Sequence, residues 1–392
     1  MSRLTETAAG IHVAERIDDV PGWERLLAAE DTFYLSPPWL RFADTDGEAE
    51  ARYLVYGDRD APLAGLPAHW AHGETNPEYV PRNVVPRLAA HESDLLTLGG
   101  RRGYLSTVAS CDDAVFARVL PDLIAEAMSA FESQPSGWWW PYLPTGAAEQ
   151  VVEAVSTAHE PVVTLVDADC RLDVVGSDLD DYLSSLPNRQ RRSNARRERK
   201  WLAASGLTVT RERLEDCLER AGELLSNVQR RHGQDNPPSQ MTAVLQAQAE
   251  RLGDHAVVFG CRDGAELVAF SLNYRWRDEL LSRLVGLDYE HEGSRNAYGE
   301  LLVYSPLSYC YEEGLSSIHL GAASLSGKCR RGARVRPLWA VSVCECTACK
   351  SERGRETLSL DKLDELCADI PATETAGFVE EVHAFGSHTQ RA

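Results

Sequence analysis

Long apolar segments are absent from this chain of 392 residues, and we expect no leader sequence. No run of about 18 apolar residues occurs, so we expect no helix that crosses a membrane. The first 19 residues, MSRLTETAAGIHVAERIDD, mix charges of both signs and lack the apolar core of a signal peptide. We therefore predict a cytoplasmic protein without membrane insertion.

A disulfide framework is also not expected, although the chain contains ten cysteines. Most of them are isolated in the sequence, and a reducing compartment keeps such thiols unpaired. Cys344, Cys346 and Cys349 are the exception, because the spacing Cys-x-Cys-x-x-Cys brings three thiolates within reach of one zinc ion. We predict a structural zinc there, with Cys329 or a histidine as a fourth ligand. The alternative is three unliganded thiols in a polar loop, and no other cofactor is required.

Positive charge is scarce overall, since the formal net charge is −20. Residues 187–200, PNRQRRSNARRERK, are the exception, with seven basic side chains and one acidic one, a net of +6. At helical spacing four of the arginines share one face, namely Arg189, Arg192, Arg196 and Arg199, and Arg197 flanks it. Guanidinium groups bind phosphate oxygens in pairs, so this helix, expected over 187–204, predicts a phosphate-binding surface. The alternative is a solvated helix paired with the acidic remainder.

Length and pattern together predict two domains, residues 1–160 and 161–343, followed by a polar extension over 344–392. The hydrophobic fraction of 43% is enough for a normal core in each. The segment YLVYGDRDAPLAGLPAHW (53–70) matches AVVFGCRDGAELVAFSLNYRW (256–276) as strand, Gly-x-Arg-Asp turn and strand, offset by 203 residues. We interpret this as an internal duplication, which predicts two similar α/β domains.

Three segments carry a family resemblance. They are the basic helix followed by a glycine and a strand (186–209), the strand running into Lys-x-x-Arg-Gly as HLGAASLSGKCRRG (319–332), and the N-terminal SPPWLRF and GGRRGYL. In these features residues 30–343 resemble the FemAB-like branch of the GNAT acyltransferase superfamily, especially its peptidoglycan biosynthesis or recognition factors. The resemblance implies an α/β (α+β) fold of tandem GNAT-like domains, each a mixed, mostly antiparallel sheet flanked by helices.

The resemblance further implies a bacterial acyltransferase that acylates an amine on a small molecule, a peptide or a cell-wall precursor, in cell-wall or natural-product biosynthesis. Lys328 and Arg331 match the family pattern, and we expect them to polarise the carbonyl during acyl transfer. Lys328 is expected in a glycine-flanked loop just after a strand, where active-site residues often lie. The donor is expected to be aminoacyl-tRNA. Acyl-CoA is the alternative, but Arg295 is followed by Asn-Ala-Tyr-Gly, which departs from the pyrophosphate motif Arg/Gln-x-x-Gly-x-Gly/Ala. Arg295 is kept as a donor-binding candidate.

A general base is not evident in the sequence. The candidates are His69, His255, His291, His319, Asp288 and Glu290, all near expected strand ends. A third functional hypothesis is therefore a non-catalytic protein that kept the fold and binds a peptide or a glycan. The sequence leads to no expectation for the oligomeric state.

Overall fold

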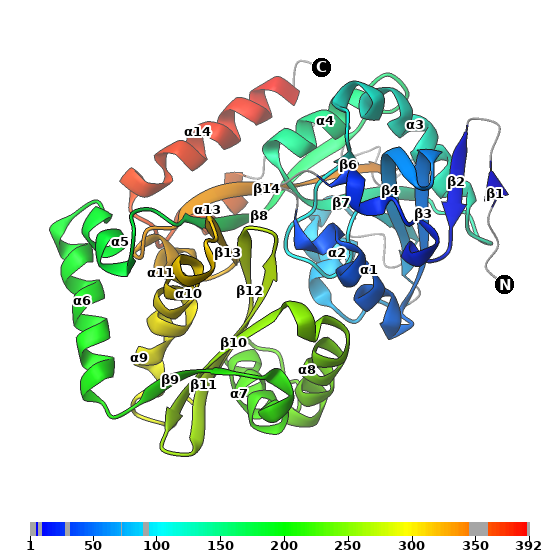
Figure 1. Ribbon diagram of the computed structural model, residues 1–392. Helices are drawn as coiled ribbons and strands as arrows, with labels where there is room; N and C mark the ends of the chain where they lie inside the picture. Colours follow the sequence, from blue (N-terminus) through cyan, green and yellow to red (C-terminus); the bar gives the residue numbers. More distant parts are fainter. Residues whose placement is uncertain are drawn as a thin grey trace. The chain divides into compact units, whose positions relative to one another are not determined.

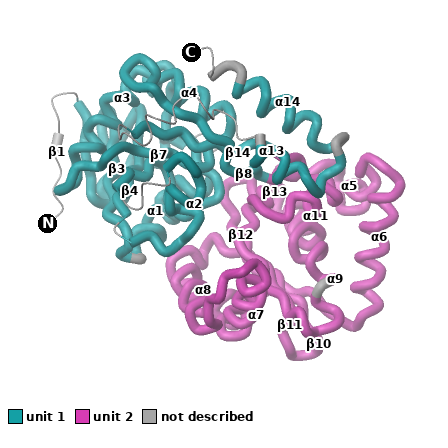
Figure 2. The backbone as a smooth tube through the Cα atoms, turned by 180° about the vertical axis from the view of Figure 1, so that it is seen from behind, with its two compact units in different colours: residues 1–169, 336–392 teal, residues 170–335 magenta. Residues whose placement is uncertain are grey.

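The structure is a computed structural model that describes residues 5–6, 10–27, 32–71, 73–88, 94–344 and 360–389. It divides into two compact units, which Figure 2 shows in different colours. Unit 1 comprises residues 1–169 and 336–392, and unit 2 comprises residues 170–335. In the described residues, no helix combines the length and the apolar composition needed to cross a membrane.

Unit 1 contains a mostly antiparallel sheet with strand order β1-β2-β3-β4-β5-β7-β14, and β6 pairs with β4 (Figure 1). Its strands are β1 (Thr5–Glu6), β2 (Ile11–Ala14), β3 (Ala49–Asp58), β4 (Ala61–Ala71), β5 (Leu95–Leu98), β6 (Ala109–Ser110), β7 (Gly137–Pro144), the first part of β8 (Val162–Asp173) and most of β14 (Arg334–Cys344). Its helices are α1 (Pro37–Ala43), α2 (Pro81–Val84), α3 (Asp113–Ser129), α4 (Thr145–Val155), α13 (Leu360–Cys367) and α14 (Ala372–Thr389). Short 3₁₀ turns lie at Ile17–Asp19, Trp23–Leu26, Phe33–Leu35, Asp44–Asp46, Pro77–Tyr79 and Pro86–Leu88.

Helix α3 illustrates how local sequence builds unit 1. The Asp112 side chain accepts hydrogen bonds from the Ala114 and Val115 N–H groups and so caps the first turn. The buried side chains recur every three or four residues: Phe116, Val119, Leu120, Leu123, Ile124 and Ala127. Each large one contributes about 1.5–3 kcal/mol by leaving water. The apolar face therefore fixes the helix against β3 and β4.

Unit 2 has the strand order β8-β13-β12-β11-β10-β9, where β8 contributes its last residues. Its other strands are β9 (Thr208–Glu212), β10 (Ala256–Asp263), β11 (Glu266–Trp276), β12 (Glu279–Leu287) and β13 (Ser317–Gly321). Its helices are α5 (Leu179–Ser185), α6 (Arg189–Ala204), α7 (Leu218–Arg231), α8 (Pro238–Leu252), α9 (Ser294–Gly299), the π-helical turn Glu300–Tyr304, α10 (Ser305–Glu313) and α11 (Leu325–Cys329). Short 3₁₀ turns lie at Leu214–Asp216 and Gly253–His255.

The two units repeat one connectivity. In unit 1 the hairpin β3–β4 is followed by β5, a helix (α3) and β7, and β5 pairs with β7 in parallel. In unit 2 the hairpin β10–β11 is followed by β12, a helical segment (α9 to α10) and β13, and β12 pairs with β13 in parallel. The predicted fold class, tandem GNAT-like domains with mostly antiparallel sheets and flanking helices, is confirmed.

The strand after the last helix of each half pairs with a strand of the other half. The end of β8, which follows α4 in the first half, pairs with β13 in unit 2, and β14, which follows α11 in the second half, pairs with β7 in unit 1. The compact units consequently divide the chain near residues 169 and 335. The boundaries at 160 and 343, inferred from the sequence repeat, stay a prediction.

Candidate functional site

Strands β12 and β13 of unit 2 diverge. In the described chain their parallel register covers three positions, Glu279–Leu281 against Ser317–His319. The paired end is closed by a polar clamp, in which Ser317 Oγ donates to Glu279 Oε1 at 2.7 Å and Arg171 Nη2 lies 2.7 Å from the same carboxylate oxygen. Beyond this clamp β12 continues to pair with β11, and β13 continues to pair with β8. Backbone groups between diverging strands can bind an extended chain that carries amide groups.

A β-bulge lies on β12 within this opening. Ser282 is in register with Asn273 and Leu284 with Leu272, which leaves Arg283 as the extra residue of the bulge. Such a bulge redirects a side chain and bends its strand. Opposite the bulge, the buried Asn273 amide donates to Ser271 Oγ at 3.3 Å and to a carbonyl of β10 at 3.1 Å. The bulge therefore has a fixed polar support on β11.

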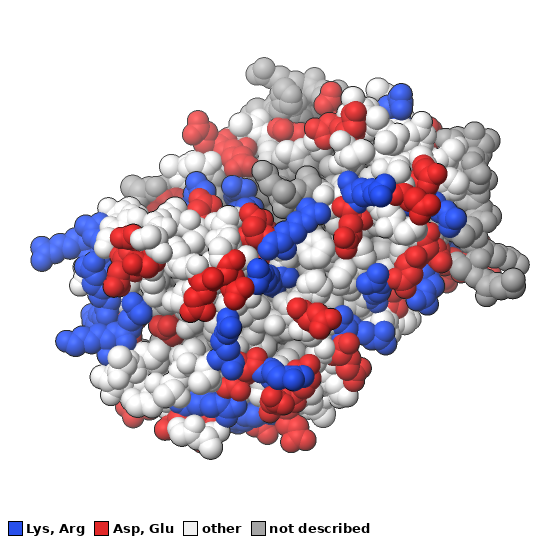
Figure 3. All heavy atoms as spheres, in the orientation of Figure 1, with Lys and Arg blue, Asp and Glu red and all other residues white. Residues whose placement is uncertain are grey.

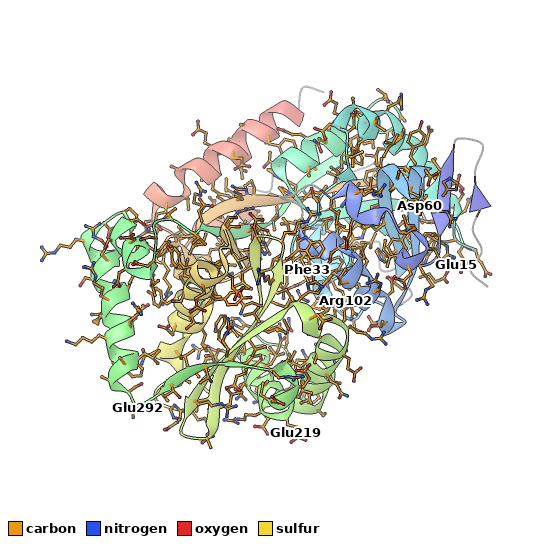
Figure 4. The ribbon with its side chains drawn as sticks, in the orientation of Figure 1. Glu15, Phe33, Asp60, Arg102, Glu219 and Glu292 are labelled. Atoms are coloured by element: carbon orange, nitrogen blue, oxygen red, sulfur yellow. The ribbon has the colours of Figure 1, made fainter. Side chains whose placement is uncertain are left out.

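The segment between β12 and α9 is organised by one carboxylate. Asp288 Oδ1 accepts from the N–H groups of Glu290 (3.0 Å) and His291 (3.3 Å), and its other oxygen lies 2.7 Å from Arg220 Nη2. Burial acts to raise the pKa of Asp288, but these hydrogen bonds and the arginine charge outweigh it, and the pKa is lowered. The segment also carries Glu292, labelled in Figure 4, so three carboxylates precede α9. This negative charge disfavours a pyrophosphate group at that place.

The segment after β13 has an unusual backbone. Ala323 and Ser324 both adopt left-handed conformations, with φ of 61° and 50°, which costs roughly 1–2 kcal/mol for each residue with a side chain. Lys328 stabilises this segment, because its Nζ donates to the carbonyl oxygens of Gly321 at 2.8 Å and Ala322 at 2.6 Å. Lys328 belongs to α11 and is 4% exposed, whereas the sequence predicted a loop position. Its ammonium group thus holds the backbone at the end of β13.

Arg331 joins three elements of unit 2. Its guanidinium binds the Glu198 carboxylate with both nitrogens of one edge, at 3.0 to 3.2 Å, and Nη1 donates to the Gly327 carbonyl at 2.8 Å. Tyr304, in the π-helical turn, donates its hydroxyl to the same carboxylate at 2.9 Å. A β-carbon at Gly299 would lie 2.7 Å from Arg331 Nε, so α9 also contacts this pair. The sequence identified Arg331 but not Glu198, its partner.

Two buried thiols meet beneath α6. Cys329 and Cys170 are 2% and 0% exposed. A hydrogen bond from Cys170 lowers the pKa of the Cys329 thiol, burial opposes this effect, and the charges of Arg191 and Lys328 add to the lowering. Cys170 and Cys329 are 159 positions apart in the sequence, so no local pattern indicated the pair.

Helix α6 separates its charges between two faces. Its inward stripe holds Arg191, Ala195, Glu198 and Leu202, of which the two apolar residues are buried. Its outward stripe holds the exposed Arg189, Arg196, Arg197 and Lys200, which we call the cationic face. Figure 3 shows basic side chains projecting along this helix. The Asn188 side chain accepts from the Arg191 N–H and so begins the helix close to the predicted position.

The predicted arginines of α6 fall into two groups. Arg189, Arg196 and Arg197 have no acidic partner in the described part of the chain. Arg192 donates to the Leu186 carbonyl at 2.6 Å, and Arg199 lies 3.6 Å from Asp180. All five arginines lie on α6. Within the described residues three of them, Arg189, Arg196 and Arg197, extend outward without a contact to an acidic side chain or a backbone carbonyl.

The other candidates for a general base lie at different places in the structure. His291 lies 3.2 Å from the exposed Asp263, and His255 contacts the Arg275 carbonyl at 3.3 Å. His69 belongs to unit 1, 3.5 Å from Asp44. His319 is 2% exposed and occupies the last position where β13 pairs with β12. Glu290 is exposed.

The remaining predicted site residues are only partly described. Arg295 lies in α9, and its side chain is outside the described residues. Cys344 is buried at the end of β14, whereas Cys346 and Cys349 lie outside the described residues. Among the described residues no group of three or more metal-binding side chains occurs. The zinc site therefore stays a prediction.

The equivalent opening of unit 1 is filled by its own chain. The loop after β5 is bound by aromatic donors, because Trp39 Nε1 donates to the Arg101 carbonyl at 2.9 Å and Tyr79 donates to Gly103 at 3.0 Å. Trp140 of β7 donates to Ser106 in the same loop at 2.9 Å. Arg102, labelled in Figure 4, lies 2.9 Å from Glu74. In unit 1 the chain itself thus occupies the place that corresponds to the diverging part of β12 and β13.

A comparison with protein families gives a match within unit 2. Residues 189–327 match the family model "Acetyltransferase (GNAT) domain", which covers the α6 helix, the diverging strands and the segment after β13. Curated proteins give no match to the sequence.

Solved structures show the same fold over most of the chain. The structure of FemX is similar with a TM-score of 0.58 and 10% identity, covering 83% of this chain and 95% of FemX. A conserved protein of unknown function from Bacteroides thetaiotaomicron gives 0.53 and 14%, covering 88% and 100%. The C-terminal domain of a protein assigned as a lysylphosphatidylglycerol synthetase, from Agrobacterium fabrum, gives 0.52 and 11%, covering 86% and 95%.

These findings establish the fold. It is that of GNAT acyltransferases, and the resemblance to FemAB-like proteins is confirmed at the level of the fold. The fold and the family model support acyl transfer from an acyl donor to an amine acceptor.

Proposed function

We propose that this protein transfers an aminoacyl group from aminoacyl-tRNA to an amine acceptor. The acceptor nitrogen attacks the ester carbonyl, the tetrahedral intermediate collapses, the ester C–O bond breaks and an amide bond forms. The proton lost by the amine reaches the released 3′ oxygen of the tRNA. Such a reaction depends mainly on positioning and on stabilisation of the developing oxyanion.

The cationic face of α6 is the observation that carries the proposal. Arg189, Arg196, Arg197 and Lys200 extend outward from a chain whose net charge is −20. Acidic residues elsewhere could neutralise them, yet none does so within the described residues. Cations kept apart in this way attract a polyanion and release its counterions on binding.

The diverging strands of unit 2 would receive the aminoacyl end. Lys328 then acts through the backbone, because it orders the left-handed segment at Ala323 and Ser324. Arg331 acts through Glu198, which connects the donor-binding helix to the end of α11. We accordingly propose Lys328 and Arg331 as positioning residues of this site, and Arg189, Arg192, Arg196, Arg197, Arg199 and Arg295 as its donor-binding group.

Acyl-CoA is the second candidate donor, and the match to the GNAT acetyltransferase model favours it. The segment that would meet the pyrophosphate carries Asp288, Glu290 and Glu292, and Asp288 already uses the N–H groups of two of its residues. Both features oppose phosphate binding there. A non-catalytic peptide- or glycan-binding protein is the third candidate, and it predicts binding without turnover.

The decisive experiment measures binding of charged tRNA and of acetyl-CoA at about 50 mM and about 200 mM salt. The double variant Arg196→Glu/Arg197→Glu tests the cationic face. The matched control is Arg25→Glu/Arg118→Glu, which makes the same charge change at two exposed arginines of unit 1. We expect salt-sensitive tRNA binding that the first variant loses and the control retains. The slope of log K against log salt should weaken by about 0.7–0.9 for each lost phosphate contact.

The other outcomes are equally clear. Acetyl-CoA binding and turnover without tRNA binding would reject the tRNA donor and favour the second candidate. Binding of a peptide or a glycan without turnover of any amine acceptor would favour the third.

A further inference from the structure

Trp201 is the most exposed of the nine tryptophans of this chain. It is 37% exposed, whereas seven of the others are buried and Trp276 is covered by contacts with His255 and Arg277. Trp201 makes no hydrogen bond and no ring contact within the described part of the chain. The exposed ring offers an uncovered apolar face to a ligand, and the side chains around it indicate which ligand.

The ring lies beside the cationic face of α6. Trp201 follows Arg197 by four residues, so the ring and this guanidinium group are neighbours on the last turns of the same helix. From Arg189 to Lys200 the cations extend about 16 Å along the helix, at about 1.5 Å per residue. A row of cations that ends in an exposed aromatic ring is the combination that binds single-stranded nucleic acid, since phosphates meet the charges and a base stacks on the ring.

We propose that Trp201 stacks on an unpaired nucleobase of the RNA whose phosphates occupy the cationic face. This inference rests on the proposed tRNA donor and adds which part of the RNA is recognised, namely its single-stranded end. A paired base inside a helix has both faces covered, so only an unpaired base can use the ring.

An anionic membrane surface is the alternative to RNA as the ligand of a basic face that carries an aromatic residue. A helix that lies in a membrane interface needs a broad apolar face. The outward side of α6 offers one exposed large apolar side chain, and the buried apolar residues of the helix, Ala195 and Leu202, face inward. One ring among cations suits a base better than a lipid layer.

The test uses fluorescence anisotropy of the full chain with two labelled RNA hairpins, one with a single-stranded 3′ end and one blunt. The variants are Trp201→Ala and Trp201→Phe, and Val244→Ala is the control, because Val244 is 40% exposed on another helix of unit 2. We expect Trp201→Ala to weaken binding of the overhang hairpin about tenfold and to leave the blunt hairpin and the salt slope unchanged. Trp201→Phe should keep most of the affinity, and Val244→Ala all of it.

Four results would overturn the inference, and they are distinguishable. Equal loss on both hairpins, or no loss on either while Arg196→Glu/Arg197→Glu abolishes binding, rejects stacking and leaves the proposed function standing. Failure of the unaltered protein to bind either hairpin or charged tRNA rejects both. Binding to vesicles that contain phosphatidylglycerol, lost in Trp201→Ala while RNA binding is unchanged, assigns the ring to a membrane surface.

Discussion

Arg331 and Glu198 form a bidentate ion pair, with N–O distances of 3.0 to 3.2 Å, that connects the segment after α11 to the middle of α6. Glu198 is the one acidic residue in the basic stretch 187–200. The pair is largely covered, with the Arg331 side chain 14% and the Glu198 side chain 35% exposed. The acid in this stretch thus anchors the helix, and the cations on the opposite face stay available.

Removal of one partner should destabilise unit 2. We expect Glu198→Gln or Arg331→Met to lower the free energy of unfolding by about 2 kcal/mol, because each leaves a partly buried group without its charged partner. The double variant should lose less than the sum of the two single losses. Denaturant unfolding of the four proteins measures this coupling, and additive losses would show that the pair contributes nothing.

Lys328→Met tests whether the ammonium group acts on the backbone or on the substrate. Two charge-assisted hydrogen bonds to Gly321 and Ala322 would be lost, so we expect about 2–4 kcal/mol less stability. A fall in kcat should accompany this loss if the segment positions the substrate. Urea unfolding and steady-state kinetics on the same preparations check both. Full stability with a large loss of kcat would instead mean that Lys328 touches the reacting carbonyl.

Gly99→Ala should severely destabilise unit 1. Gly99 has a φ of +80°, and a β-carbon there would lie 2.2 Å from Trp140 Nε1. The conformational cost alone is about 1–2 kcal/mol, and displacement of the tryptophan adds to it. The matched control is Gly146→Ala in α4, where the β-carbon meets nothing within 4 Å and alanine favours the helix. Thermal unfolding should show a clear decrease in Tm for the first variant and none for the second.

The lowered pKa of Asp288 predicts an acid-dependent contribution to stability. A carboxyl group with a lowered pKa in the folded state stabilises fully above its ordinary pKa of about 3.8 and loses this contribution as the pH falls through the folded value. Asp288→Asn keeps an oxygen for the Glu290 and His291 N–H groups but removes the charge that faces Arg220. We therefore expect the variant to be less stable than the unaltered protein at pH 6.

That stability difference should shrink as the pH falls below about 3.8. Unfolding by urea at a series of pH values measures it. A difference that stays constant from pH 6 to acid pH would mean that the carboxylate charge contributes nothing.

Local sequence was sufficient for much of unit 2. The basic segment 187–204 predicted α6, and Gly314, with a φ of +69°, ends α10 through a local backbone conformation that glycine adopts readily. The matched Gly-x-Arg-Asp turns predicted both hairpins, β3–β4 and β10–β11. These features depend on caps, turns and periodicity, which act over a few residues.

Other features depend on distant contacts and were not predicted. α14 packs on α4, and Phe385 contacts the Trp339 ring at 4.7 Å between centroids. The predicted loop at Lys328 is a short buried helix, because its ammonium group is satisfied by two carbonyl groups. No short-range sequence pattern predicts which carbonyl group a long side chain will contact.

The sequence by itself determined that this protein has two related α/β halves, a single concentrated basic helix and a Lys-x-x-Arg-Gly segment after a strand. Tertiary structure decided which cations remain available, because Glu198 binds Arg331 on one side of α6 and leaves Arg196, Arg197 and Lys200 on the other. It also decided that Trp140 holds the loop after β5 in unit 1, whereas β12 and β13 of unit 2 pair over three positions and then diverge. The physical reason is that charge and periodicity are properties of neighbouring residues in the sequence. Ion pairing and burial depend instead on which remote residues the fold brings into contact.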